Sequence, residues 1–156
     1  MALKGKIGAE IEIHSPASKF FSVFITQLHE VQNMTDEVHQ TKLHQGDWHG
    51  VGSNSVKHWT FISGGKIVNC KEHIEEIDHT NKTVIFNLFD GYASERYKML
   101  KVKLKVVEKV VEKSEGALAK WTWKYEKLHE AIPPPQDYIH YITKLTKDVD
   151  AHLLKA

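Results

Sequence analysis

The feature that most constrains the fold is the C-terminal third of the chain, where an alternating segment, residues 119–125, precedes a proline triplet and a long amphipathic segment. Four side chains of the alternating segment share one parity, and therefore one face of an extended strand: Ala119, Trp121, Trp123 and Tyr125. Lysines and a threonine take the other parity, which indicates a solvent face. We therefore expect this strand to point three large aromatic rings toward the interior.

Residues 136–154 carry an apolar stripe with the periodicity of an α-helix. Its members recur at spacings of four, three, four and four residues: Tyr138, Ile142, Leu145, Val149 and Leu153. Tyr141 widens the stripe. The prolines at 133–135 form a rigid lead-in, because proline fixes φ and is tolerated at the start of a helix. A long helix laid over a curved, aromatic-lined sheet is an architecture that can bind a ligand.

The rest of the chain divides into short alternating segments joined by turns, which is typical of an antiparallel sheet. We expect strands at residues 6–14, from 38 onward, and at 53–62, 66–78, 84–88 and 97–107, besides the strand at 119–125. Ser15 is predicted to cap a short helix that begins at Pro16, and residues 27–37 form a second. A glycine-rich loop, residues 44–53, joins two strands. Seven strands in meander order with these helices make an α+β fold.

For two of the expected strands, the sequence leaves open which side chains point toward the interior. The two possible interior sets of residues 53–62 are Lys57, Trp59 and Phe61, or Val56, His58 and Thr60. The aromatic side chains favour the first set. Residues 66–78 hold inward candidates of both parities: Ile67 and Asn69, then Glu72 and Ile74. A bulge near Cys70 would be needed to keep all of them inward.

The composition fits a single domain spanning residues 1–156. A chain of this length can bury a core without disulfides, and its one cysteine, Cys70, excludes an internal disulfide framework. With 21 basic and 20 acidic side chains, the net charge of +1 favours neither nucleic acid nor anionic membrane as a partner. No apolar segment is long enough for a signal peptide or a membrane span, and no long apolar surface stripe is left over. We therefore expect a cytoplasmic monomer.

Short motifs along most of the chain match one family in their order and spacing. They are Gly46-Asp47-Trp48, Val51-Gly52-Ser53, Trp59-Thr60-Phe61, Lys71-Glu72, Lys120-Trp121-Thr122, Tyr125-Glu126-Lys127-Leu128 and Lys147-Asp148-Val149-Asp150. From Gly5 to Leu153 the chain resembles the major latex proteins of plants, a branch of the birch-pollen-allergen-like superfamily. The turn at residues 78–81 is similar to the allergen branch.

The resemblance implies a helix-grip fold, in which a seven-stranded curved antiparallel sheet, two short helices and one long C-terminal helix enclose a hydrophobic cavity. Members of the family bind lipids, sterols, plant hormones and other hydrophobic metabolites, in settings that include defence and stress. A few relatives are enzymes of alkaloid biosynthesis. The expected partner is therefore a hydrophobic small molecule, and no cofactor is expected.

A carrier or receptor for such a molecule would line its cavity from the sheet and the long helix. The expected apolar lining is Trp59, Phe61, Val84, Phe86, Leu100, Val102, Ala119, Trp121, Trp123 and Tyr125 from the sheet, with Tyr138, Ile142 and Leu145 from the helix. Pockets of this kind carry a few polar anchors, for which Lys57, Asn69, Glu72 and the Tyr125 hydroxyl are the candidates. The alternative is that the same residues pack a solid core, which periodicity alone does not exclude.

An enzyme is the second hypothesis, either an isomerase or a condensing enzyme acting on a hydrophobic, alkaloid-like substrate. Acid–base catalysis needs a titratable group inside the cavity with a shifted pKa. The candidates are Glu72, Lys57, Tyr125 and His58. A buried glutamate near a lysine is more often a structural ion pair than a catalytic one, so this function ranks second.

Ribonuclease activity, claimed for allergen-like relatives, has little support in this chain. The positions that match the residues usually invoked carry Lys98, Thr146 and Asp148, which departs from the family pattern. The glycine-rich loop lacks the lysine and following Ser or Thr of a phosphate-binding loop. The eleven histidines are scattered without metal-ligand spacing, so no metal site is expected.

Overall fold

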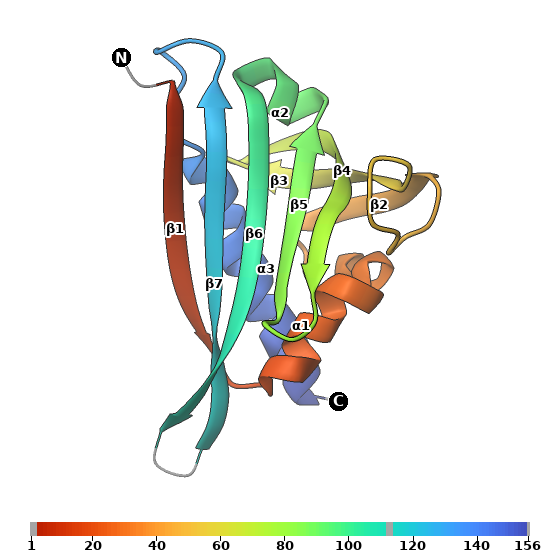
Figure 1. The fold of residues 1–156 in the computed structure, drawn as a ribbon, viewed down its shortest axis with the longest axis vertical. Helices are drawn as coiled ribbons and strands as arrows, with labels where there is room; N and C mark the ends of the chain where they lie inside the picture. The colour runs from red at the N-terminus through yellow and green to blue at the C-terminus, as the bar shows by residue number, and fades with distance from the viewer. Residues whose placement is uncertain (1–2, 112–113, 156) are drawn as a thin grey trace.

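The computed structural model describes residues 3–111 and 114–155. Seven strands form one antiparallel sheet in the order β1-β7-β6-β5-β4-β3-β2 (Figure 1). Their bounds are Lys4–Ile13 (β1), Val38–Gln45 (β2), Val56–Ser63 (β3), Lys66–Asp78 (β4), Thr83–Phe89 (β5), Tyr97–Val111 (β6) and Ser114–Lys127 (β7). Strands β2 to β7 form a meander, and β1 lies at the edge beside β7, the last strand of the chain. The predicted strands and their antiparallel arrangement are confirmed.

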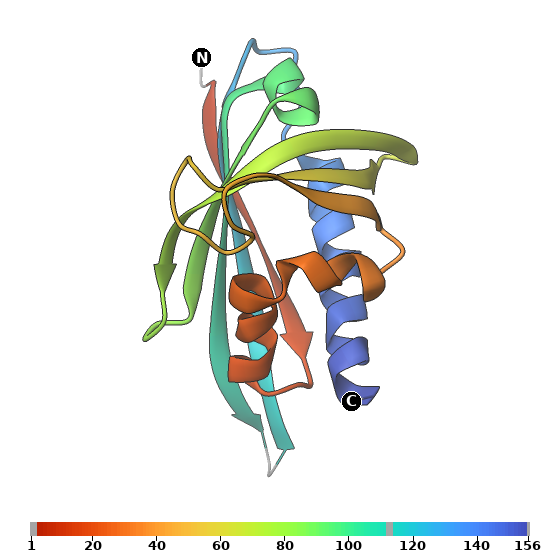
Figure 2. The same ribbon diagram turned by 90° about the vertical axis from the view of Figure 1, so that its right-hand side faces the viewer.

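Four helical segments accompany the sheet. They are α1 (Ala17–Thr26), the 3-10 helix η1 (Leu28–Asn33), α2 (Gly91–Arg96) and α3 (Gln136–Lys155). Figure 2 shows α3 running along the inner side of the curved sheet, with β2, β3 and β4 bending over it and α1 between the sheet and α3. The two short helices after the first strand and the long C-terminal helix are as predicted. Helix α2, between β5 and β6, was not predicted.

On the central strands, apolar side chains that point inward alternate with side chains that point outward, and the inward ones form the core. Val84, Phe86 and Leu88 of β5 are buried, and the lysines of β6 face outward, where Lys101 forms an ion pair with Glu75 at 2.7 Å. On α3 the predicted stripe is buried from Tyr138 to Val149. Period 2 on the strands and period 3.6 on the helix therefore meet in one apolar interior. None of the described helices is long and apolar enough to cross a membrane.

The first of the two possible faces of β3 points inward. Lys57, Trp59 and Phe61 are buried, whereas His58 is only half-buried and lies on the opposite face of the strand. His58 pairs with Lys71 of β4, another outward residue. The candidate role of His58 as an acid or base in the cavity is therefore wrong, because its parity is opposite to that of the interior residues.

The bulge expected near Cys70 is absent from the pairing of β3 with β4, which is regular from Lys66 to His73. A regular ladder fixes one parity, so Cys70, Glu72 and Ile74 point inward and the other parity points out. Ile67 is 64% exposed and Asn69 is exposed too. Asn69 therefore faces solvent, and its predicted role as a polar anchor in the cavity is wrong. The irregularity lies further along, between Ile74 and Glu76 against β5.

The start of α1 differs from its prediction as well. Pro16 takes the N-cap position, and the Ser15 side chain makes no cap hydrogen bond there. Instead the Ser15 hydroxyl donates to Asp150 Oδ1 of α3 at 2.6 Å, and the backbone N–H groups of His14 and Ser15 donate to the same carboxylate. A buried carboxylate is a stronger acceptor than a neutral group, so it holds the loop between β1 and α1 against α3.

Candidate functional site

A cavity lies between the concave face of the sheet and helices α1, η1 and α3. Its free volume is about 30 Å³. The side chains around it are mostly apolar or aromatic: Phe24, Leu28, Val31, Trp59, Phe61, Cys70, Glu72, Phe86, Val102, Trp121, Tyr138, Tyr141, Ile142 and Leu145. One water molecule needs about 10–15 Å³ on this measure, so the cavity has room for about two.

The structure separates the predicted lining into three groups. The first surrounds the cavity: Trp59, Phe61, Glu72, Phe86, Val102, Trp121, Tyr138, Ile142 and Leu145. The second is buried in the core away from the cavity: Val84, Leu100, Ala119, Trp123 and Tyr125. The third is Asn69 alone, on the outer face of β4. Parity identified which side chains are interior, but not how far along each strand the cavity extends.

Five lining residues were missed at the sequence level. They are Phe24, Leu28, Val31, Cys70 and Tyr141. Phe24 is one of the buried residues of α1, a helix that lies on the inner side of the sheet (Figure 2). Cys70 has the parity of Glu72, so a regular β4 would have identified it. Leu28 and Val31 are the buried residues of η1, a segment whose pattern was ambiguous.

Aromatic rings from β3 and α3 fill most of the space that the helix spans. The Phe61 ring stacks on Tyr141 with centroids 4.5 Å apart, and Tyr138 lies edge-on to both rings at 5.6 and 5.3 Å. Burial raises the pKa of Tyr138 and of Tyr141 well above the usual value, so both phenols stay neutral. The small free volume follows from this cluster.

A second, open hollow of about 260 Å³ lies on the surface beside α3. Its walls come from the start of β2, the turn between β3 and β4, and the outer side of α3: Glu37, Ile62, Gly64, Gly65, Asp137, His140, Tyr141 and Lys144. Tyr141 belongs to both linings and therefore borders both the cavity and the surface hollow.

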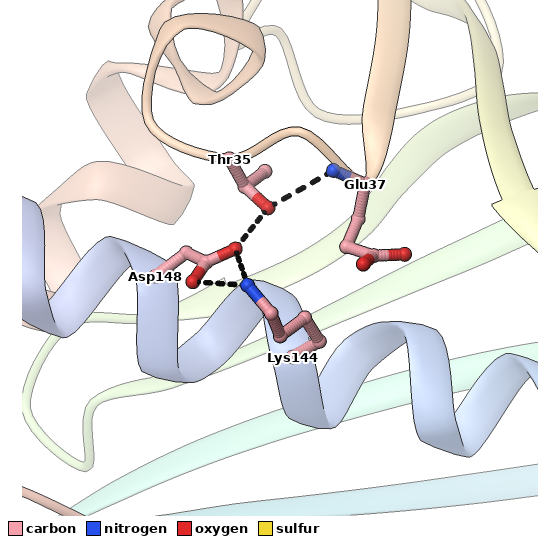
Figure 3. Close-up of polar contacts among 4 residues, drawn as sticks. All are labelled: Thr35, Glu37, Lys144 and Asp148. Atoms are coloured by element: carbon pink, nitrogen blue, oxygen red, sulfur yellow. Dashed lines mark hydrogen bonds and ion pairs between the residues drawn. The ribbon is translucent and has the colours of Figure 1, made fainter.

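Polar contacts fix α3 beside this hollow (Figure 3). The Thr35 hydroxyl donates to Asp148 Oδ2 at 2.7 Å, and Lys144 Nζ lies 2.6 Å from both carboxylate oxygens. The backbone N–H of Glu37 donates to the Thr35 hydroxyl at 3.2 Å, which ties the start of β2 into the same group. The segment between η1 and β2 is thus held to the last turns of α3.

Glu72 and Lys57 form the polar part of the interior. They are opposite each other on β4 and β3, and Lys57 is completely buried. Lys57 Nζ donates to the backbone carbonyl of Trp48 in the glycine-rich loop at 3.1 Å, and within the described residues its side chain forms no ion pair with Glu72. Burial lowers the pKa of Lys57, against the opposing influence of the Glu72 charge. The expected structural ion pair is therefore replaced by a lysine bound to a carbonyl.

Glu72 supplies the one carboxyl among the described residues that line the cavity. Burial raises the pKa of Glu72 to about 7, while the Lys57 charge and the nearby Trp59 indole lower it. Glu72 Oε1 and Trp59 Nε1 are both buried and without a hydrogen-bond partner among the described residues. The Trp59 N–H is close enough to influence the carboxyl but does not meet hydrogen-bond geometry with it.

The other catalytic candidates are not brought together with Glu72. Tyr125 is buried beside Tyr97, with ring centroids 5.7 Å apart, and pairs with Gly5 of β1 away from the cavity. His58 is on the outer face. Of the four candidates, only Glu72 lines the cavity.

The positions that match the ribonuclease residues have structural roles. Thr146 is fully buried and accepts a hydrogen bond from Trp121 Nε1 at 3.0 Å. Asp148 binds Thr35 and Lys144, and the Lys98 side chain is 61% exposed near Glu126. Within residues 3–111 and 114–155, no three His, Cys, Asp or Glu side chains are grouped so that they could hold a metal ion.

Comparison with known proteins gives a consistent result over the whole chain. The model of the pathogenesis-related protein Bet v 1 family matches residues 2–156. MLP-like protein 43 of Arabidopsis thaliana is 33% identical over 154 residues, covering 98% of this chain and 95% of the relative. Major latex protein 146 of Papaver somniferum is 30% identical over 152 residues, covering 97% and 92%.

Solved structures agree with the fold. The crystal structure of major latex-like protein 151 from Panax ginseng superposes with a TM-score of 0.86 at 32% identity, covering 97% of this chain and 98% of the other. Ara h 8.0201 superposes with a TM-score of 0.73 at 17% identity, covering 98% and 99%, which is a likeness of fold alone.

Proposed function

The chain belongs to the pathogenesis-related protein Bet v 1 family, and we propose that it binds a hydrophobic small molecule between the concave face of the sheet and α3. The observation that carries the proposal is the cavity itself, which has aromatic rings from β3, β5, β7 and α3, aliphatic side chains from η1 and α3, and a single carboxyl. Apolar pockets with few polar groups are the usual form of small-molecule sites.

The ligand is a lipid, sterol, hormone or secondary metabolite of a plant, carried by a cytoplasmic monomer in defence or stress. This part of the proposal follows the family resemblance of the motifs around Trp48, Trp59 and Trp121. The dispersed charge of the chain supports a small-molecule partner over nucleic acid.

Binding requires the cavity to enlarge, because pockets for molecules of this size are usually about 300–1,000 Å³. The free volume of about 30 Å³ is far below that range. Rotation of Tyr141 toward the surface would join the cavity to the hollow of about 260 Å³. The stack of Tyr141 on Phe61 contributes about 0.5–1.5 kcal/mol beyond the burial of the ring. A ligand that fills the vacated space replaces the lost apolar burial. The ligand therefore reaches the interior between α3 and the turn that joins β3 to β4.

Titration with a panel of apolar molecules tests the proposal directly. Tryptophan fluorescence reports on binding, because Trp59 and Trp121 line the cavity, and displacement of a bound apolar dye measures affinity. Ile142→Trp places a large side chain in the cavity and is expected to weaken binding about tenfold or more. Leu154→Trp adds the same side chain to the same helix at a position that is 54% exposed, and is expected to leave binding unchanged.

Circular dichroism and urea unfolding establish that both variants fold, and Ile142→Phe is a milder replacement if Ile142→Trp does not. The absence of quenching and of dye displacement across the panel would contradict the proposal. Equal binding by the Ile142 variants and the parent protein would place the ligand elsewhere.

Acid–base catalysis on a hydrophobic substrate, as an isomerase or condensing enzyme, is the second candidate. The observation that favours it is the position of Glu72 in the cavity with a pKa of about 7, where a carboxyl can both accept and return a proton near neutral pH. Glu72→Gln is expected to abolish any detected turnover, and turnover that survives this change would remove Glu72 from the role.

A further inference from the structure

Two polar groups at the edge of the cavity lack partners, and they belong to neighbouring residues. Trp59 pairs with Cys70 across β3 and β4, and Lys57 pairs with Glu72, so Glu72 is the diagonal neighbour of Trp59 on the inward face. Trp59 Nε1 is a donor without an acceptor, and Glu72 Oε1 is an oxygen without a donor, both buried. Buried polar groups are almost always paired, so such an unpaired couple calls for an explanation.

Packing within the described residues does not satisfy these two groups. The nearest strong donor, Lys57, points its ammonium to the Trp48 carbonyl and does not line the cavity. The other titratable groups that face Glu72 are Cys70 on the same strand, β4, and Tyr138 and Tyr141 of α3, all neutral near pH 7 because burial raises their pKa. About two water molecules fit in the cavity beside these groups, and a bound molecule that displaces them has to supply the complementary group itself.

We propose that the bound molecule carries a hydroxyl group that donates to Glu72 Oε1 and accepts from Trp59 Nε1. The inference rests on the proposed function, since it names the chemical class of that ligand: an alcohol or phenol with an apolar body. A hydroxyl is the smallest neutral group that both donates and accepts. A ketone oxygen only accepts, so it leaves the carboxylate unpaired, and a ligand carboxylate is repelled by Glu72.

The position of these groups also sets the orientation of the ligand. Glu72 and Trp59 lie on the wall formed by β3 and β4, whereas the aliphatic Ile142 and Leu145 lie on α3. The hydroxyl end therefore faces the sheet, and the apolar body lies under α3 toward Tyr141.

Three molecules of one shape separate the hydroxyl from the apolar body: 4-tert-butylcyclohexanol, 4-tert-butylcyclohexanone and tert-butylcyclohexane. Their affinities are measured by calorimetry and by displacement of a bound dye at pH 8.5, where Glu72 is mainly ionised. The alcohol is expected to bind about tenfold or more tightly than the ketone and the hydrocarbon, because the unpaired groups of the site remain unpaired with the other two.

Two variants remove one partner each, and a third is the control. Glu72→Leu is expected to reduce the preference for the alcohol over the ketone to less than about twofold, because both oxygens can then accept only from Trp59. Trp59→Phe is expected to weaken binding of the alcohol and of the ketone relative to the hydrocarbon, because it removes the donor that both oxygens use. Trp123→Phe removes an indole N–H that is also buried and unpaired among the described residues but lies away from the cavity. This variant is therefore expected to keep the full preference for the alcohol over the ketone and the hydrocarbon. Unfolding by urea shows that each variant is folded at the temperature of the assay.

The outcomes distinguish this inference from the proposed function. If all three molecules bind the parent protein equally, if the full preference for the alcohol over the ketone persists in Glu72→Leu, or if Trp59→Phe weakens the alcohol no more than the hydrocarbon, recognition of a hydroxyl is wrong while apolar binding stands. If none of the three molecules binds, and no molecule of the wider apolar panel binds either, then both the proposed function and this inference are wrong.

Discussion

Tyr141 of α3 stacks on Phe61 of β3, with ring centroids 4.5 Å apart and 26° between the ring planes. Because Tyr141 lines both the inner cavity and the surface hollow, this stack separates the two. The contact links the stability of the interior to its accessibility, since the same ring that fills the core also closes it. A single side chain can therefore be used to change access without altering the polar groups of the site.

Removing the ring of Tyr141 is expected to open the cavity. Tyr141→Ala should increase the association rate of an apolar dye about tenfold, the gain expected if an open state populated at about one part in ten becomes permanent. The same change should lower the free energy of unfolding by about 3–5 kcal/mol, as for other large-to-small replacements in a core. Stopped-flow fluorescence and urea unfolding measure the two effects. Tyr141→Phe keeps the ring and should change the rate little; an equal acceleration in this variant would contradict a steric barrier.

The stability of the protein should depend on the ionisation of Glu72. Burial raises the pKa of Glu72 from 4.5 to about 7, so the folded state retains a proton that the unfolded state releases in this range. The free energy of unfolding contributed by Glu72 therefore falls as the pH rises from 4.5 to 7. Glu72→Gln removes this loss and should gain stability relative to the parent by up to roughly 3 kcal/mol between pH 4 and pH 8.

Urea unfolding of both proteins across this range is the measurement. Burial lowers the pKa of His49 and of His73, which makes stability rise with pH in part of the same window, but the parent and the variant share this effect. Glu76→Gln removes an exposed carboxylate with no ion pair among the described residues and serves as the control, with no comparable trend expected. A difference between Glu72→Gln and the parent that stays constant with pH would show that Glu72 keeps an ordinary pKa.

The carboxylate of Asp150 should contribute strongly to stability. It accepts hydrogen bonds from the backbone N–H groups of His14 and Ser15 and from the Ser15 hydroxyl. Asp150→Asn loses the charge and one acceptor oxygen, with an expected cost of about 1.5–3 kcal/mol. Asp148→Asn, on the partly exposed side of α3, should cost at most about 1 kcal/mol. Urea unfolding measures both variants. Equal losses in the free energy of unfolding would show that the hydrogen bonds of Asp150 contribute no more than the contacts of Asp148.

The hydrogen bond between Trp121 and Thr146 should also be detectable. Thr146→Val keeps the shape of the side chain but removes the acceptor, which leaves a buried indole N–H unpaired at a cost of about 1–3 kcal/mol. Thr143→Val is the matched control, because the Thr143 hydroxyl only donates to the Ile139 carbonyl within the helix, and should cost about 0.5 kcal/mol or less. A small effect of Thr146→Val would mean that the core rearranges to satisfy the indole.

Local patterns were sufficient to predict most of the fold. Alternation identifies the interior face of a strand wherever the ladder is regular, as it does for Val84, Phe86 and Leu88. Helical spacing identifies the buried face of α3 for the same reason. Helix α2 was missed because its six residues are too few for a periodicity to be recognised.

Local patterns could not predict which side chains line the cavity or how far they fill it. Asn69 was assigned inward because a bulge was assumed, and only the pairing of β4 with β3 shows that none is needed there. The Ser15 contact joins residues 135 positions apart in the sequence, so the helix-cap prediction had no means of anticipating Asp150. How far Phe61 and Tyr141 fill the interior depends on the distance between α3 and the sheet.

The pairing of β1 with β7 has a consequence for how the chain is made. Lys4 lies opposite Glu126 and Ile13 opposite Ala117, so β1 leaves the ribosome before its partner β7, which is synthesised only after the five strands between them. Until then the apolar side of β1 remains open to other nascent chains, and sheet closure by so distant a contact is slow. A translation product that stops before β7 is therefore expected to leave the apolar side of β1 exposed.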